Sequence, residues 1–200
     1  MLKTELYNNL ITKKTKFFLI FIKKILKKYI YGVKINQNQL NLYTLGINML
    51  HLLTFLKNNN IANFDKLVDI VVVDNISNLN RFEVNYIFWN MLYEYRFSIK
   101  IFTDGIKIIY SVNNFYKSAL WLEREIWDMY GIKFLFQVGL RRVLTDYGFK
   151  GHPLRKDFPL LGYVDVYYDD SIQSIKVAPV ELAQSLRFFK FDNPWNKWYL

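Results

Sequence analysis

The segment LRRVLTDYGFKGHPLRKDFPLLGY, residues 140–163, follows neither the helical nor the strand period and decides how the chain is organised. Charged side chains alternate in it with glycines and prolines. Irregular segments of this length are uncommon in compact domains, where they are usually functional or disordered. Large apolar side chains such as Phe149, Phe158 and Tyr163 argue against a solvated coil. We therefore predict an ordered loop that serves as a docking surface.

Regular elements are predicted on both sides of this loop. Upstream, alternating apolar residues predict strands at 33–35 and 40–45 in a hairpin around 36–39, and extended segments at 67–73, 82–92 and 97–102. Helical apolar spacing predicts a helix through Leu50, Leu53 and Leu56 that ends at 58–60. A second helix is predicted from Ser118 to Tyr130, closed by Gly131. Downstream, two short strands are predicted at 164–168 and 175–177. This order predicts an α+β fold: a mixed sheet with helices packed on it, followed by the long irregular loop and an extended C-terminal tail.

The predicted helix at 118–130 carries both apolar and charged faces. Leu122, Ile126 and Tyr130 recur every four residues and are expected to face the sheet. Arg124 and Asp128 are expected on another face, spaced to pair with each other. An ordinary surface helix explains such charges. An exposed Trp127 among them, however, is more typical of an interface.

The N-terminal residues form a basic arm. Nine lysines and a single acid, Glu5, fall in residues 1–35, so the arm holds +8 of the net charge of +10. Residues 16–31 predict an amphipathic helix whose lysines oppose an apolar stripe of Phe18, Ile22, Ile25 and Tyr29. Membrane-surface binding and organelle targeting both fit this pattern, while packing of the stripe on the body or on a neighbouring subunit is the plainer alternative. We expect an arm at 1–31, an α+β domain at 32–134, and the docking loop with its tail at 135–200.

Composition excludes several kinds of chemistry. The chain has no cysteine, so it holds no disulfide, thiolate nucleophile or cysteine-ligated iron–sulfur cluster. His51 and His152 are its only histidines, and neither a metal-ligand spacing nor a glycine-rich nucleotide-binding loop is visible. The longest apolar runs, such as 17–22, are too short to span a bilayer. We therefore expect no catalytic, cofactor-binding or metal site in this chain. The bias toward Phe, Tyr, Ile, Asn and Lys over Ala is typical of an AT-rich, organellar gene.

The C-terminal tail is strongly aromatic. Between Pro179 and Leu200 it carries Phe188, Phe189, Phe191, Trp195, Trp198 and Tyr199. Aromatic surface of this extent is typical of an interaction site. The tail is therefore expected to lie on a partner.

Three motifs in this order resemble one known family. EREIWDMYGIKF at 123–134, the loop at 140–163 and PVELAQSLRFF at 179–189 are similar to subunit 9 of mitochondrial NADH dehydrogenase (complex I), which has a counterpart in the bacterial NADH:quinone oxidoreductase. The resemblance is specific over about 118–195 and weaker over 32–117. It implies a structural subunit of the peripheral arm on the matrix side of the inner mitochondrial membrane, with NAD, FMN, iron–sulfur clusters and ubiquinone bound by partner subunits.

The resemblance also implies partners and contact residues. The chain is expected to pack on the hydrogenase-like large subunit that forms the quinone site, next to the iron–sulfur small subunit and other complex I subunits, with no nucleic acid and with membrane contact only indirect or through the arm. The interface residues that it implies are Glu123, Arg124, Glu125, Trp127, Asp128, Arg141, Arg142, Asp146, Tyr147, His152, Pro153, Arg155, Lys156, Asp157, Phe158, Pro159, Pro179, Glu181, Gln184 and Arg187. Local contacts are expected to differ where the chain departs from the family pattern, at Gln137, Val138 and Gly139, at Tyr167 and at Ala178.

Two other functions compete with this one. An enzyme would use His152 with Asp146 or Asp157 for acid–base work, but no nucleophile or metal set accompanies them. An organellar ribosomal or RNA-binding protein would use the basic arm together with the abundant Tyr and Phe.

Overall fold

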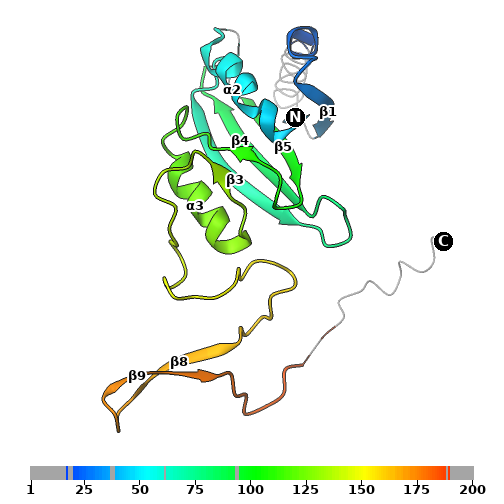
Figure 1. Ribbon diagram of the computed structural model, residues 1–200. Coiled ribbons are helices and arrows are strands. Elements are labelled where there is room, and N and C mark those ends of the chain that lie inside the picture. Colours follow the sequence, from blue (N-terminus) through cyan, green and yellow to red (C-terminus); the bar gives the residue numbers. More distant parts are fainter. Residues whose placement is uncertain are drawn as a thin grey trace, which may run out of the picture. The chain divides into compact units, whose positions relative to one another are not determined.

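The computed structural model describes residues 17, 20–36, 39–60, 62–92, 95–187 and 189 (Figure 1). The chain divides into two compact units, Met1–Phe158 and Pro159–Leu200. The first contains a five-stranded sheet with helices, and the second contains a two-stranded hairpin. The expected boundaries after residues 31 and 134 stay a prediction.

The large sheet of the first unit is mixed, as predicted. Its strand order is β1-β2-β5-β4-β3, and every neighbouring pair is antiparallel except the parallel pair β2 and β5. The strands are β1 (Ile30–Asn36), β2 (Gln39–Thr44), β3 (Lys66–Asp74), β4 (Phe82–Asn90) and β5 (Tyr95–Thr103). Smaller elements are the 3-10 helix η1 (Gly46–Asn48) and the short parallel pair β6 (Ile109–Tyr110) and β7 (Phe134–Leu135).

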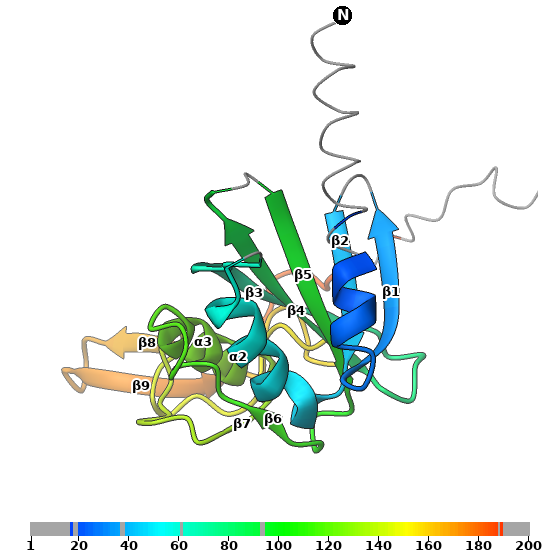
Figure 2. The same ribbon diagram turned by 90° about the horizontal axis from the view of Figure 1, so that it is seen from above.

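One face of this sheet carries the core because apolar residues alternate along the strands. In β4 the side chains of Phe82, Val84, Tyr86 and Phe88 are buried, while the residues between them are half-buried. The helices α2 (Met49–Asn58) and α3 (Ala119–Tyr130) lie on the same face of the sheet (Figure 2). Their buried side chains belong to one cluster with those of the strands.

Helix α2 shows how local spacing fixes a segment on the sheet. Met49, Leu52, Leu53 and Leu56 recur with the helical period and are fully buried. The helix ends where the N–H of Asn59 donates to the carbonyl of Phe55, which confirms the predicted stop at the asparagines.

The predicted helix at 16–31 is too long. Phe17 and residues 20–25 are helical, but the chain turns at Leu26 and enters β1 at Ile30. Ile22 and Leu26 are buried in the core, whereas Ile25, which was placed on the apolar stripe, is 47% exposed. The strand prevails because β1 satisfies its backbone polar groups by pairing with β2. Phe18 lies outside the described residues.

The second unit contains the hairpin predicted downstream of the loop. Strands β8 (Val164–Asp169) and β9 (Ser174–Pro179) pair in antiparallel register. Phe189 is exposed, and the other aromatic residues of the tail, Phe188, Phe191, Trp195, Trp198 and Tyr199, lie outside the described residues. Within the described part of the chain, no helix is both long and apolar enough to cross a membrane.

Leu52 provides a test of the core. Replacing Leu52, which is fully buried, by alanine is expected to lower the free energy of unfolding by about 2–5 kcal/mol, because the change removes apolar contacts and leaves a cavity. Urea titration would measure the loss. The matched control is Leu79→Ala at a side chain that is 99% exposed, and equal losses in the two variants would contradict this description of the core.

Candidate docking site

The segment that leads into the docking loop begins where α3 ends. Gly131 closes the helix with φ 77°, a left-handed conformation that favours glycine, as predicted. A Cβ at Gly131 would lie 2.5 Å from the Nη2 atom of Arg155 and 2.6 Å from the Nε2 atom of His152. Glycine at this position therefore ends the helix and also leaves space for the side chains of His152 and Arg155. At the other end of α3, Ser118 makes no side-chain cap and instead donates to the carbonyl of Leu67 at 3.4 Å.

Asp128 holds the first half of the loop, which corrects its predicted place on the surface of α3. Its side chain is fully buried, and its ion pair joins Oδ1 to Nη1 of Arg142 at 2.7 Å rather than to Arg124. The hydroxyl of Thr145 donates to the same oxygen at 2.6 Å. Backbone N–H groups of Val143, Leu144 and Thr145 donate to Oδ2 at 3.1, 2.9 and 3.0 Å.

These donors determine the charge of Asp128. Burial alone would raise the pKa of this carboxyl, but the hydrogen bonds from Thr145, Arg142 and Leu144 outweigh burial and hold the pKa well below its usual range. Asp128 is therefore ionised, and the loop wraps its N–H groups around a buried negative charge. The guanidinium of Arg142 also lies over the rings of Trp127 and Phe149, at 5.5 and 5.7 Å from their centroids.

The carbonyl groups at the C-terminus of α3 hold the middle of the loop. Nε of Arg155 donates to the carbonyl of Tyr130 at 2.6 Å, and the N–H of Leu154 donates to the carbonyl of Met129 at 3.2 Å. Nδ1 of His152 lies 2.9 Å from the carbonyl oxygen of Asp128. The last carbonyls of a helix lack partners within the helix, and a cation there also complements the helix dipole.

Arg81 holds the end of the loop against the β3–β4 hairpin. It forms a bidentate pair with Asp74, at 2.6 and 2.7 Å, and a second one with Asp157, at 3.0 and 2.7 Å. The N–H of Lys156 also donates to Asp74 at 2.9 Å. The Arg81 guanidinium lowers the pKa of Asp74 and lowers that of Asp157 to about 2. The sequence predictions missed Asp74 and Arg81, because partners this far apart in the chain leave no periodic signal.

Glu123 and Arg124 are also internal, contrary to their predicted place on exposed faces of α3. Glu123 is fully buried and accepts hydrogen bonds from the hydroxyl of Ser111 and the N–H of Val112, both at 2.7 Å. Burial raises the pKa of the Glu123 carboxyl to about 7, although these hydrogen bonds act in the opposite direction. Arg124 donates to the carbonyl of Val138 at 3.3 Å, so it binds one of the residues where the chain departs from the family pattern.

The structure therefore sorts the candidate residues of the first unit by exposure. Glu123, Arg124 and Asp128 are buried, whereas Trp127, Arg142, His152, Pro153, Arg155 and Phe158 are half-buried, and Glu125, Arg141, Asp146, Tyr147, Lys156 and Asp157 are exposed. Trp127 was expected to be exposed, but the exposed tryptophan of α3 is Trp121, over which the guanidinium of Arg141 lies at 5.8 Å. The roles of all of these residues at an interface stay a prediction.

The second unit presents an apolar face. Pro159 is half-buried, and Pro179, Glu181, Gln184 and Arg187 are exposed. The register of β8 and β9 places six apolar side chains on one side of the hairpin: Val164, Val166, Tyr168, Ile175, Val177 and Pro179. All of them are exposed. A two-stranded hairpin is marginally stable by itself, and clustered exposed apolar residues mark binding surfaces.

The residues considered for acid–base work are engaged in contacts that hold the loop. His152 is directed to a backbone carbonyl, and Asp157 is paired with Arg81. Among the described residues, no cluster of three or more His, Cys, Asp or Glu side chains is arranged to hold a metal ion.

Solved structures share this fold. A trypsin-resistant fragment (1-134) of Nqo5 superposes with a TM-score of 0.50 at 22% identity, covering 59% of this chain and 94% of the fragment. A chain of the membrane-bound sulfane sulfur reductase, an archaeal respiratory membrane complex, gives a TM-score of 0.58 at 24% identity, covering 70% of this chain and 85% of that one. The chain therefore has the α+β fold of a class of respiratory-complex subunits.

Sequence similarity identifies the family within that class. The model of the family "Respiratory-chain NADH dehydrogenase, 30 Kd subunit" matches residues 47–164. The chain is 42% identical to NADH dehydrogenase [ubiquinone] iron-sulfur protein 3 of Oryza sativa subsp. japonica, over 86% of this chain and 90% of that protein. It is 39% identical to NADH-ubiquinone oxidoreductase subunit 9 of Reclinomonas americana, over 90% of this chain and 88% of that protein. A bacterial relative, an NADH-quinone oxidoreductase subunit of Paramagnetospirillum magneticum, is 41% identical over 88% of each chain. The chain belongs to this family of complex I subunits, which confirms the resemblance.

Asp128 provides a test of the first loop anchor. Asp128→Asn keeps the size of the side chain but leaves Arg142 without its buried counter-charge, so we expect a loss of about 3–5 kcal/mol in the free energy of unfolding. Thermal and urea unfolding of the full chain would measure it. Asp146→Asn, at an exposed loop carboxylate, is the control, and a loss no larger than that of the control would contradict the anchoring role.

Glu123 predicts a dependence of stability on pH. The folded state raises the pKa of this carboxyl from 4.5 to about 7, so the folded state binds a proton more tightly than the unfolded state does. The free energy of unfolding therefore falls by up to about 3 kcal/mol as the pH rises from about 4.5 to about 7. Glu123→Gln removes this dependence, so the variant should gain stability relative to the wild type between about pH 5 and about pH 8. Parallel stability curves for the two proteins across this interval would contradict the assignment.

Proposed function

We propose that this complex I subunit is a structural component of the peripheral arm, on the matrix side of the inner mitochondrial membrane. In this proposal it braces the hydrogenase-like large subunit that forms the quinone site, beside the iron–sulfur small subunit. The named mitochondrial relatives support the location, and family membership supports partners within complex I. We propose the same division of labour along the chain as above: an arm at 1–31, a body at 32–134 and a docking region at 135–200.

The observation that carries this proposal is the difference between the two sides of the docking region. Asp128 and Arg81 hold the loop from its inner side. The outer side leaves Arg141, Asp146 and Tyr147 exposed, the last with 80% of its surface accessible. A loop fixed in shape before it meets its partner loses less conformational entropy on binding, which favours affinity and register.

The apolar face of the β8–β9 hairpin supplies the second contact. Val166 and Val177 lie opposite each other in the register, between Val164 and Tyr168 of β8. Covering these side chains with a partner would remove apolar surface from water, which favours binding by roughly 25 cal/mol of free energy per Å² buried. The charged loop would then set the register of the contact, while the hairpin supplies much of the affinity.

In this proposal the chain takes part in electron transfer without binding a redox centre. The rice relative is named an iron-sulfur protein, whereas this chain has no cysteine and so cannot supply thiolate ligands. NAD, FMN, the clusters and ubiquinone would be bound by partner subunits. The work of this chain would be to keep cluster and quinone at electron-transfer distance by holding the large subunit rigid. The relatives are respiratory-chain subunits, and this leaves the RNA-binding alternative without support.

The hairpin provides the test of docking. Val166→Asp places a charge on the apolar face, so we expect less assembled complex on blue-native gels while the melting temperature of the isolated protein stays within about 2 °C of the wild type. The reason is that a buried, unpaired carboxylate is costly only where a partner covers it.

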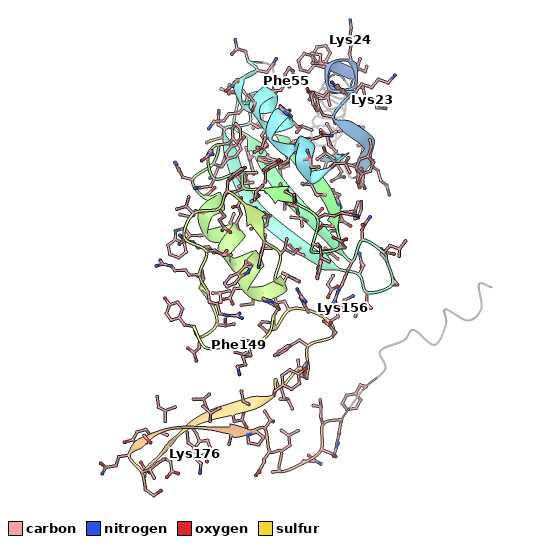
Figure 3. All side chains as sticks on the ribbon, in the orientation of Figure 1. Lys23, Lys24, Phe55, Phe149, Lys156 and Lys176 are labelled. Atoms are coloured by element: carbon pink, nitrogen blue, oxygen red, sulfur yellow. The ribbon has the colours of Figure 1, made fainter. Side chains whose placement is uncertain are left out.

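Lys176→Gln is the matched control for this test. Lys176 lies on the opposite face of the same hairpin, across from Tyr167 (Figure 3), so this variant is expected to assemble normally. Normal assembly of Val166→Asp, or equal defects in the two variants, would contradict docking through the apolar face.

A further inference from the structure

The strand β3 forms an edge of the large sheet. It is last in the strand order and pairs with β4 on one side, and no described strand pairs with its other side. An uncovered edge presents a row of backbone donors and acceptors to any extended chain nearby. In this respect β3 differs from the buried strands β4 and β5, which pair on both sides.

Two hydrogen bonds show which residues of β3 direct their backbone groups outward. The N–H of Asn75 donates to the carbonyl of Arg81 across the β3–β4 hairpin at 2.8 Å, and directions alternate along an antiparallel strand. The N–H of Ile70 donates to the carboxylate of its neighbour Asp69 at 2.8 Å. Both observations place the backbone groups of Ile70 and Val72 on the outer edge.

The chain itself closes both ends of this edge. Ser118 donates to the carbonyl of Leu67 at one end, and the N–H of Lys156 donates to the carboxylate of Asp74 at the other. Residues 68–73 lie between these two contacts. The free edge is therefore a site of limited length and does not continue as an open ladder.

A groove runs beside the free edge. Its volume is about 200 Å³, and it lies between β3 and α3 with Leu154 of the docking loop contributing to its lining. Ile70, Val72 and Ile126 give it an apolar lining, and Asp69 and Glu125 place carboxylates on it. This lining suits alternate apolar side chains of an extended segment that carries a basic residue.

The opposite face of β3 is also apolar. Val68, Val71 and Val73 are 44%, 40% and 41% exposed, respectively. Proteins protect such edges with lysines, prolines or bulges, but here Lys66 and the irregularity between Leu67 and Asp69 protect only the beginning of the strand. An exposed apolar edge of this kind promotes aggregation unless a partner covers it.

We propose that an extended segment of another complex I subunit adds to β3 as a sixth strand along residues 68–73. Its backbone pairs with Val72 and with the carbonyl of Ile70, whose N–H already donates to Asp69. Its alternate apolar side chains enter the groove, and a lysine or arginine faces Asp69 and Glu125. The proposal rests on the membership of this chain in a multisubunit complex and is independent of how the docking loop and hairpin meet the large subunit.

The absence of cysteine from the sequence allows a direct test. Val71→Cys introduces a single thiol beside the edge, and Leu79→Cys introduces one on a fully exposed side chain after the same strand. Maleimide labelling rates are compared between the purified full chain and the assembled complex. We expect Val71→Cys to react at least about tenfold more slowly in the complex, because side chains of the added strand would lie beside the thiol and obstruct the maleimide, while Leu79→Cys keeps its rate.

Further readouts identify what covers the edge. Cross-linking from Val71→Cys followed by mass spectrometry should recover an extended segment of a different subunit. In the unmodified complex, amide exchange at Val72 should slow by at least about tenfold relative to the purified chain, so the test survives if the variant fails to assemble. Unchanged labelling and exchange in the complex, or cross-links only to this chain or to a second copy of it, would overturn the proposal. A Val166→Cys reporter on the hairpin separates this outcome from a failure of docking, because its protection depends on the partner of the hairpin.

Discussion

The first half of the docking loop depends on one interaction: a buried, ionised carboxylate at Asp128 that gathers donors from residues 142–145. Its partners include a guanidinium, a hydroxyl and three successive backbone N–H groups, so each oxygen of the carboxylate is fully used. A charge taken out of water is tolerated only with compensation of this kind. Because the donors come from residues 142–145, the carboxylate fixes the path of the loop as well as its distance from α3.

The other anchors extend the same principle along the loop. Arg155 uses the unpaired carbonyl at the end of α3, and Arg81 joins the loop to the sheet through two carboxylates. The charged residues that first indicated a binding surface are therefore divided between two tasks. Some of them, such as Arg142, hold the loop from within, and their neighbours, such as Arg141, remain available to a partner. This division suits the proposed bracing role, because a surface that is rigid before contact loses less conformational entropy on binding.

Sequence reasoning predicted the elements whose pattern is local. The alternation in β4, the apolar spacing in α2 and the left-handed Gly131 each follow from short-range rules, and the structure confirms them. Sequence reasoning failed where contact with a residue far away in the chain determines burial or pairing. The spacing of Arg124 and Asp128 suggested a pair within one helix, but the loop offers Asp128 more donors than Arg124 can. The burial of Glu123 depends on Ser111 and Val112, and no helical period reveals them. The early end of the N-terminal helix likewise reflects strand pairing with β2.

Amide hydrogen exchange at residues 143–145 tests the central claim most directly, since their N–H groups bind the Asp128 carboxylate. The measurement compares the isolated full chain with the assembled complex. If Asp128 shapes the loop before docking, these amides are already protected in the isolated chain, and assembly adds little. If they exchange at the rate of an unstructured chain until the complex forms, the partner shapes the loop and the account is contradicted.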